Sequence, residues 1–302
     1  MKSIPNVAIK SKILLKPVTC KNIGISAKLF STTKVVNNIV LVENKQGVRI
    51  ITLNRPERFN SFNSEMFDTL RNVLNDTSRD GSVKLAVITG TGDYFTSGND
   101  LANFERLERE LKGDMNAIAD RSVDTIQPFI GSLIDFQKPL IAAVNGPAIG
   151  IGATLLAHTD AVWASDSAYF YTPFTGLGII AEACSSHTFP AIMGTIRANE
   201  MLMFNYKMGA QEARECGLVS RVVPKQEFRE RVEEWVFGAK GLLNTSYPKS
   251  MQSTKQLLRN ATKRQTLHAI NAEECLQLRE RMASDEARDA INKFMNRKKS
   301  AK

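Results

Sequence analysis

The chain has 302 residues, of which 43% are hydrophobic and 24% charged, which is the composition of an ordinary globular protein. Its formal net charge of +9 is uneven: residues 1–34 hold seven lysines and no acidic residue, so the remainder carries only +2. This nearly neutral body argues against a nucleic-acid-binding protein, and no run approaches the roughly 20 apolar residues of a membrane span.

The first 34 residues have the composition of a targeting leader. They lack acidic residues, contain several serines and threonines, and end in Leu-Phe-Ser-Thr-Thr at residues 29–33. This pattern resembles a mitochondrial transit peptide, although its basic residues are all lysines and the first arginine is Arg49. We therefore expect residues 1–34 to direct the protein to the mitochondrial matrix. The alternative is a disordered basic tail.

The cysteines and histidines predict neither disulfide bonds nor a metal site. The cysteines are scattered without a Cys-x-x-Cys pair and one lies in the leader, so we expect free thiols in a reducing compartment. The histidines do not have the spacing of metal ligands. These residues are Cys20, Cys184, Cys216, Cys275, His158, His187 and His268.

The body opens with the pattern of a hairpin and a helix. Two β-rich runs at 39–41 and 48–53 around a polar turn predict two antiparallel strands. Apolar residues at helical spacing over 66–74 then predict a helix that Asn63 or Ser64 caps.

A glycine-rich turn follows the next strand. The strand is predicted at 85–89, and the turn, GTGDYFTSGNDL, occupies residues 90–101. The mostly charged residues 103–116 predict a solvated, mobile segment. Residues 123–134 return to helical spacing, although Pro128 is expected to bend or interrupt that helix.

A second glycine-rich turn lies in KPLIAAVNGPAIGIGATLLAH at 138–158, where Gly150 and Gly152 separate a buried strand from a short helix. A strand, a glycine turn and a helix start present unpaired N–H groups that can bind an anion or a developing oxyanion. The alternative is a tight packing turn that needs small residues. A dinucleotide-binding fingerprint fails on spacing, because Leu155 stands where the third glycine is required.

An isolated acidic residue and a helical tail complete the chain. Glu182 stands among apolar residues just ahead of a predicted helix, where it is either a functional carboxylate or a residue that stabilises the helix start. After a strand predicted at 218–223, only helices are predicted from Phe228 onward. This order predicts an α/β body at 35–227 and a helical region at 228–302.

Together these features resemble the crotonase (enoyl-CoA hydratase/isomerase) superfamily, and within it most closely the Δ3,Δ2-enoyl-CoA isomerase type 2 branch. The resemblance covers about residues 35–298. Members of this branch often carry an acyl-CoA-binding domain ahead of the catalytic body, and here we expect a single-domain version without one. The motifs, in order, are NRPERFNSFN at 54–63, GDYFTSGNDL at 92–101, KPLIAAVNGPAIGIGATLL at 138–156, TPFTGLGIIAEACSSHTFPAIM at 172–193 and HAINAEEC at 268–275.

The resemblance implies a spiral of ββα units and a C-terminal helical region that closes the site and builds a homotrimer or a dimer of trimers. It implies an oxyanion hole formed by the backbone N–H groups of Asn99 and Ile151. It also implies an acyl-CoA thioester as substrate, so that CoA is part of the substrate and no separate cofactor is needed. The expected substrate-binding residues are Ser97, Gly98, Asn99, Asp100 and Leu101.

The resemblance makes Glu182 the acid/base. Removal of a proton next to a thioester needs a place for the enolate charge, and two preorganised N–H donors supply it, at about 2.7–4 kcal/mol per donor. A single carboxylate then takes the proton from C2 and returns it at C4, and apolar neighbours that raise its pKa suit both steps. Relatives usually have proline before this glutamate, whereas Ala181 stands here and loosens the backbone that directs the carboxylate.

The hydratases of the superfamily use two glutamates to hold and split water, and their positions correspond to Thr154 and Phe174. We therefore expect an isomerase that converts 3-enoyl-CoA to trans-2-enoyl-CoA in unsaturated fatty acid β-oxidation. The alternatives are a non-catalytic crotonase-like scaffold and another acyl-CoA hydratase or isomerase of the superfamily. The C-terminal residues 299–302 differ from a peroxisomal Ser-Lys-Leu signal, which favours mitochondria over peroxisomes.

Overall fold

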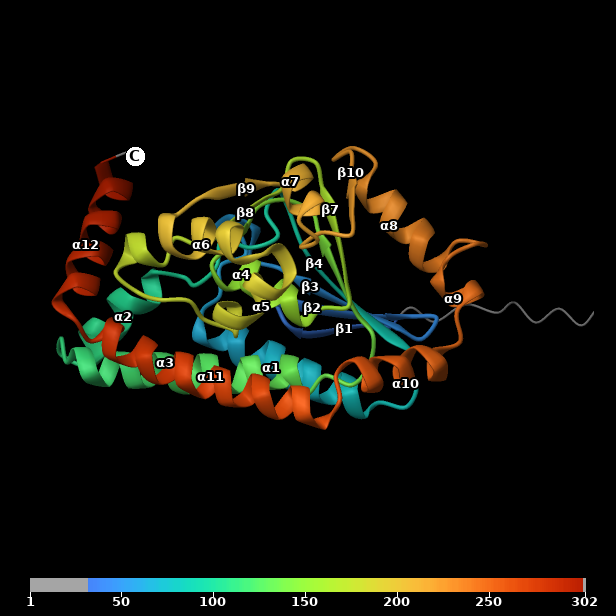
Figure 1. Cartoon of the computed structure of the whole chain (residues 1–302), viewed down its shortest axis with the longest axis horizontal. Helices are drawn as coiled ribbons and strands as arrows, with labels where there is room; N and C mark the ends of the chain where they lie inside the picture. Colours follow the sequence, from blue (N-terminus) through green and yellow to red (C-terminus); the bar gives the residue numbers. More distant parts are fainter. Residues whose placement is uncertain (1–31, 301–302) are drawn as a thin grey trace, which may run out of the picture. The chain divides into compact units, whose positions relative to one another are not determined.

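The computed structural model describes residues 32–300, and its main element is a seven-stranded sheet (Figure 1). The strand order is β1-β2-β3-β4-β5-β7-β10. The predicted leader therefore lies outside the described residues, except that residues 32–34 begin strand β1. The strands are β1 (Thr32–Asn37), β2 (Val40–Lys45), β3 (Val48–Leu53), β4 (Leu85–Gly90), β5 (Leu140–Val144), β7 (Ala161–Ser165) and β10 (Arg221–Val223).

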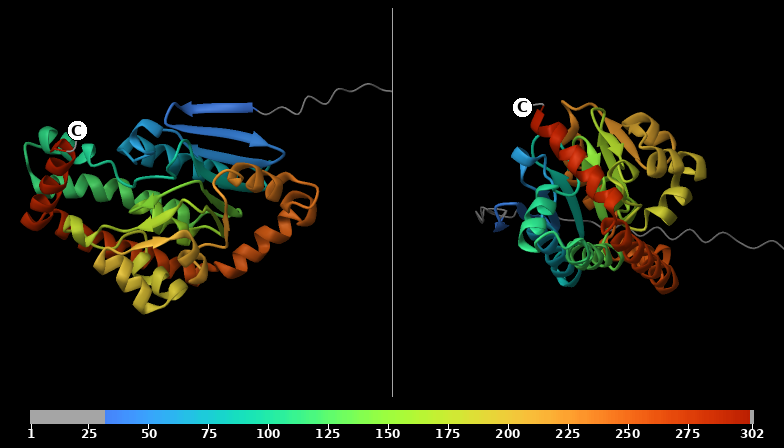
Figure 2. Two further views of the ribbon diagram at one scale, coloured as in Figure 1. Left: turned by 90° about the horizontal axis from the view of Figure 1, so that it is seen from above. Right: turned by 90° about the vertical axis from the view of Figure 1, so that its left-hand side faces the viewer.

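The sheet has an antiparallel edge and a parallel centre. Strands β1, β2 and β3 are antiparallel, with β1 at the edge (Figure 2). The predicted hairpin of β2 and β3 is confirmed, and its two turn residues, Gln46 and Gly47, both have positive φ, as tight hairpins require. From β3 to β10 each pair is parallel. The segments that follow β4 and β5 therefore leave the sheet at the same end.

A smaller sheet and the helices complete the fold. Strands β6 (Ala148–Ile149), β8 (Tyr169–Tyr171) and β9 (Lys207–Gly209) form the second sheet. The helices of the body are α1 (Ser64–Arg79), α2 (Ala102–Glu110), α3 (Met115–Ile134), α4 (Ile151–Thr154), α5 (Ser185–Met193), α6 (Thr195–Phe204) and α7 (Ala210–Glu215). Three single-turn helices are η1 (Pro56–Arg58), η2 (Leu155–His158) and η3 (Thr175–Leu177).

After β10 the described residues form helices alone. These are α8 (Phe228–Phe237), α9 (Leu242–Thr245), α10 (Pro248–Leu258), α11 (Ala261–Met282) and α12 (Asp285–Ser300). Helix α11 lies along α3 (Figure 1). The α/β class and the C-terminal helical region are thus confirmed, whereas the trimer-building role of that region stays a prediction. In the part of the chain that is described, no helix has the length and apolar character needed to cross a membrane.

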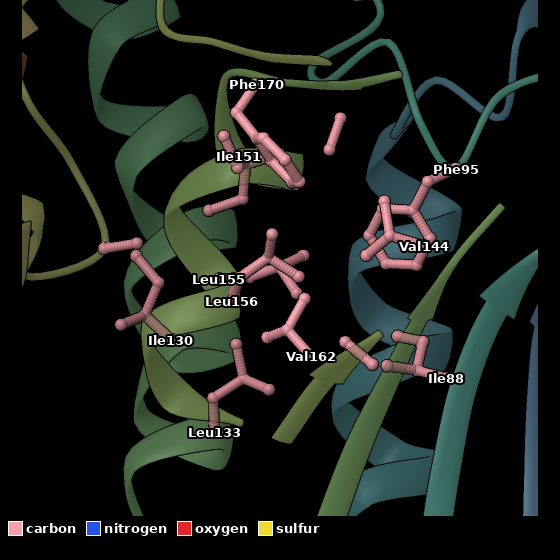
Figure 3. Close-up of a cluster of buried hydrophobic side chains, with 14 of the residues drawn as sticks. Ile88, Phe95, Ile130, Leu133, Val144, Ile151, Leu155, Leu156, Val162 and Phe170 are labelled. Atoms are coloured by element: carbon pink, nitrogen blue, oxygen red, sulfur yellow. The ribbon is translucent and has the colours of Figure 1, made fainter. Parts of the chain in front are cut away.

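Different helices cover the two faces of the large sheet, because successive strand residues point to opposite faces. On one face, sheet residues pack against α1, α3 and η2, and Figure 3 shows Ile130 and Leu133 facing Leu155 and Leu156 within this core. On the other face, residues such as Val87 pack with α8. Helix α1 begins as predicted, since the Asn63 side chain accepts a hydrogen bond from the Met66 N–H at 2.8 Å.

Two local expectations need correction. The charged segment 103–116, expected to be solvated and mobile, is helical: it forms α2 and the start of α3, and Phe104, Leu107 and Met115 within it are buried in one cluster with Ile118 and Ile291. The charges at the intervening positions hid this narrow apolar stripe. Helix α3 also continues without interruption through Pro128, where packing along α11 supports a helix that lacks one backbone donor.

The location of the core predicts that replacing leucine with alanine destabilises the protein much more at a buried position than at an exposed one. Leu133→Ala in α3, where the side chain is 1% exposed, is expected to lower the free energy of unfolding by about 2–5 kcal/mol, because it leaves a cavity. Leu257→Ala in α10, where the side chain is 79% exposed, is expected to change it by less than about 0.5 kcal/mol. Urea unfolding of both variants measures the difference, and similar losses would contradict the assignment of the core.

Candidate active site

The two glycine-rich turns lie in direct backbone contact. Thr96 in the first turn donates its N–H to Pro147 O at 3.2 Å and accepts the Ile149 N–H at 3.0 Å. A Cβ atom on Gly98 would lie 2.6 Å from Ile149 O, and one on Gly150 would lie 3.9 Å from the Gly98 Cα. Glycine at position 98 is thus what permits this approach, because any side chain would push the turns apart.

The first turn presents the backbone N–H of Asn99. Its neighbours pair with Phe62, which donates its N–H to Gly98 O at 2.8 Å and accepts the Asp100 N–H at 2.9 Å. Because successive peptide groups of an extended segment point in opposite directions, the Asn99 N–H points away from Phe62. No acceptor for it occurs among residues 32–300.

The second turn presents the backbone N–H of Ile151. This residue is the first of α4, and no side chain caps that helix, so its N–H lacks an intrahelical acceptor. Gly150 adopts a φ of 56° there and donates its own N–H to Tyr171 O at 2.8 Å. Within the described residues the Ile151 N–H has no acceptor either, so two adjoining turns each contribute one unpaired donor.

Ion pairing fixes the remainder of the first turn. Arg55 lies 3.0 Å from the Asp100 carboxylate, and both side chains are largely buried. The other carboxylate oxygen of Asp100 accepts the Ala102 N–H at 3.1 Å, where α2 begins. Ser97 donates its N–H to Phe59 O, while Leu101 is half-buried and Asn99 is exposed. Hydrogen bonds and this ion pair thus hold the predicted substrate-binding segment, residues 97 to 101, beside Gly150.

Glu182 is a buried carboxylate that lacks a hydrogen-bond partner among the described residues. Its side chain is 7% exposed, and no group within residues 32–300 donates to it. Its apolar neighbours Ile179, Ile180 and Ala181 pack against the core. Burial, and secondarily the charge of Glu274, raises the pKa of Glu182 to about 8. The carboxyl group therefore exchanges protons near neutral pH, as an acid/base must.

The segment that carries Glu182 is strained and is tied to the helix that begins at Ile151. Ala183 and Cys184 have φ values of 58° and 60°, a conformation that costs about 1–2 kcal/mol for each residue other than glycine. Ala183 O accepts a hydrogen bond of 2.8 Å from His158 Nε2, at the end of η2, which directly continues α4. One helical unit thus joins the second glycine-rich turn to the Glu182 segment.

The two positions that correspond to the hydratase glutamates hold no carboxylate. Thr154 is fully buried in α4, with its hydroxyl 3.4 Å from Gly150 O, and Phe174 belongs to the hydrophobic core. No cluster of metal-binding side chains occurs in the part of the chain that the structure describes.

Sequence reasoning missed two residues of this site, His158 and Glu274. Glu274 accepts hydrogen bonds from the Cys184 N–H at 2.6 Å and the Ser186 N–H at 3.0 Å. Glu274 lies in the motif HAINAEEC, so the sequence did contain a feature that could have pointed to it. For His158 the only such feature is its position at the end of the second glycine-rich stretch.

Known proteins resemble this chain along most of its length. The family model described as enoyl-CoA hydratase/isomerase matches residues 43–301. Enoyl-CoA delta isomerase 2 of Rattus norvegicus is 44% identical over 86% of this chain, and the chain spans only 64% of that protein. Enoyl-CoA delta isomerase 3, peroxisomal, of Mus musculus is 42% identical over 87% of this chain and 80% of its own length. The crystal structure of an enoyl-CoA hydratase/isomerase from Pseudoalteromonas atlantica T6c has a TM-score of 0.74 and 29% identity, covering 86% of this chain and 97% of that one.

The buried carboxyl predicts that Glu182→Gln makes the protein more stable at alkaline pH. The ordinary glutamate pKa is 4.5, and in the folded protein it is about 8, so between these values the folded state binds the extra proton. Wild-type stability therefore falls as the pH rises from about 4.5 to 8. The variant lacks this part of the pH dependence, because glutamine does not ionise. Above pH 8 we expect the variant to be more stable by on the order of 4 kcal/mol. Parallel stability curves in urea unfolding across this pH range would contradict the expectation.

Proposed function

Because the chain belongs to the enoyl-CoA hydratase/isomerase family, we propose that it is a Δ3,Δ2-enoyl-CoA isomerase that converts 3-enoyl-CoA to trans-2-enoyl-CoA. The observation that carries this proposal is the buried Glu182 carboxylate, unpaired among the described residues, on a segment tied to the second glycine-rich turn. The names of the relatives from rat and mouse support the same reaction.

In the proposed mechanism Glu182 moves one proton between two carbons of the acyl chain. The ionised carboxylate takes a proton from C2, the C2–H electrons form the C1–C2 double bond of an enolate, and the thioester oxygen takes the charge. The N–H groups of Asn99 and Ile151 hydrogen-bond to that oxygen, each contributing about 2.7–4 kcal/mol. Glu182 then delivers the proton to C4. The electrons of the C3–C4 double bond form the new C4–H bond, those of the C1–C2 double bond form the C2–C3 double bond, and the thioester C=O is restored.

The same geometry disfavours the addition of water. Hydration needs a second acidic group that activates a water molecule, and the buried Thr154 and Phe174 side chains offer no basic oxygen of that kind. A raised pKa also suits an internal proton shuttle, because the group has to release the proton that it has just accepted.

The remaining assignments follow the same proposal. Residues Ser97 to Leu101 bind the acyl-CoA thioester through backbone groups. CoA is part of the substrate, and no separate cofactor takes part. We propose a homotrimer or a dimer of trimers that acts in unsaturated fatty acid β-oxidation. The basic leader favours the mitochondrial matrix, and the peroxisomal name of the mouse relative makes the peroxisome the alternative.

The direct test is an assay of the full chain with 3-hexenoyl-CoA and, separately, 2-hexenoyl-CoA. We expect formation of the conjugated 2-enoyl product, little hydration, and a loss of about 10²–10⁴-fold in kcat for Glu182→Gln, the range for removal of a general acid/base. Robust hydration would favour another hydratase of the family. If CoA ligands bind but neither substrate reacts, the non-catalytic scaffold is supported instead.

The contact between the turns gives a second prediction. Gly98→Ala places a Cβ 2.6 Å from Ile149 O at a φ of 81°, so the turn must shift and the Asn99 N–H must move with it. We expect kcat/KM to fall by about 100-fold, as for the loss of one oxyanion donor. Gly209→Ala is the matched control, because a Cβ there has no atom within 4 Å. Equal activity of the two variants would count against the proposed oxyanion hole.

A further inference from the structure

The peptide group that joins Ala183 to Cys184 is held at both of its polar ends. Its C=O accepts the hydrogen bond from His158 Nε2 at 2.8 Å, and its N–H donates to the Glu274 carboxylate at 2.6 Å. His158 comes from η2 and Glu274 from α11, so two distant segments grip one peptide plane. Both side chains are buried, with exposed fractions of 0% and 6%.

We propose that His158 and Glu274 are positioning residues for the reaction of Glu182, because they clamp the Ala183–Cys184 peptide, one residue further along the chain, and thereby fix the direction of the Glu182 carboxylate. This inference rests on the proposed function. The clamped peptide connects the two left-handed residues, Ala183 and Cys184, and this conformation relaxes unless contacts hold it.

Glu274 also occupies the N-terminus of α5. Besides the Cys184 N–H, it accepts hydrogen bonds from the Ser186 N–H at 3.0 Å and the Ser186 hydroxyl at 2.5 Å. The first N–H groups of a helix attract a carboxylate, and hydrogen bonds to its oxygens favour the ionised form and make it a weaker base. With Glu274 in that place, the nearby Glu182 is left without a donor among the described residues.

The charge of Glu274 acts on Glu182 through the same arrangement. Burial raises the pKa of Glu274 above its ordinary value, and its hydrogen bonds from Ser186 and Cys184 oppose that rise. No such hydrogen bond opposes the effect of burial at Glu182 among the described residues. The other titratable groups around the segment stay neutral near pH 7: burial raises the pKa of the Cys184 and Cys275 thiols to about 12 and lowers that of His158 to about 4.

Two cations, Lys255 and Arg259, face the clamp from α10 and from the residue that follows it, and both act on His158 rather than on Glu182. Glu274 is therefore the charged group that acts on Glu182 among the described residues. Removal of the Glu274 charge is expected to lower the pKa of Glu182. Without that charge the proton on Glu182 is held less tightly.

The test is Glu274→Gln, which keeps the shape of the side chain and removes its charge. We expect the Glu182 carboxyl to titrate about one unit lower in the free, full-length protein labelled with ¹³C at the glutamate side-chain carboxyl carbon, with Glu182→Gln identifying the resonance. The rising limb of the kcat/KM profile for 3-hexenoyl-CoA is expected to move to lower pH by the same amount. A purely structural role would scale activity at every pH and leave the limb in place.

Glu273→Gln is the matched control, since it makes the same change one residue earlier on α11 at an exposed position. A Glu182 titration that is the same in the Glu274→Gln and Glu273→Gln variants would overturn the inference. Because the resonance is read without substrate, this result is independent of the enzyme assay. If the wild type converts no enoyl-CoA, the proposed function fails, but the titration still shows whether the Glu274 charge acts on Glu182.

A second pair of variants tests the other half of the clamp. His158→Leu removes the donor to Ala183 O, and His158→Gln keeps a side-chain N–H. We expect about a 10–100-fold fall in kcat for the leucine variant, with KM nearly unchanged, and substantial recovery in the glutamine variant. Equal kcat in the two variants, with thermal unfolding showing both folded, would overturn the role of His158.

Discussion

The site depends on the close approach of two backbone turns at one end of a parallel sheet. Strands β4 and β5 are adjacent and parallel, so the turns that follow them start side by side. They come into contact because Gly98 leaves room for Ile149 O. Backbone donors held in this way need no reorganisation when charge develops between them, which is the condition under which they stabilise a transition state most.

The proposed mechanism also requires one buried carboxyl group that changes its protonation state. Glu182 and Glu274 are both buried, yet their environments differ. Glu274 has three hydrogen-bond donors and caps a helix, while Glu182 has none among the described residues. Under the proposed mechanism two chemically identical side chains thereby have different tasks: Glu274 holds the backbone, and Glu182 exchanges the proton.

The sequence predicts those features that depend on neighbouring residues. The hairpin, the Asn63 cap and the α/β order follow from local patterns, and the spacing of the glycines indicates two backbone corners. Features that depend on distant partners are missed: Phe104 and Leu107 of α2 are buried in a cluster that includes Ile291, far along the chain. The roles of His158 and Glu274 likewise appear only when three segments meet at one peptide group. The sequence also predicted apolar neighbours that raise the pKa of Glu182, but not that Glu274 and His158 hold the segment beside it.

The sequence separation between Cys184 and Glu274 determines when their contact can form during synthesis of the chain. Ninety positions separate Cys184 from Glu274, so the ribosome has already extended the chain well past the sheet before this contact can form. Contacts of such long range are costly in chain entropy and are made late. A nascent chain that has built its sheet therefore still lacks a properly held carboxylate. Under the proposed mechanism, full activity therefore appears only after α11 has docked, and it reports that the C-terminal helices have assembled.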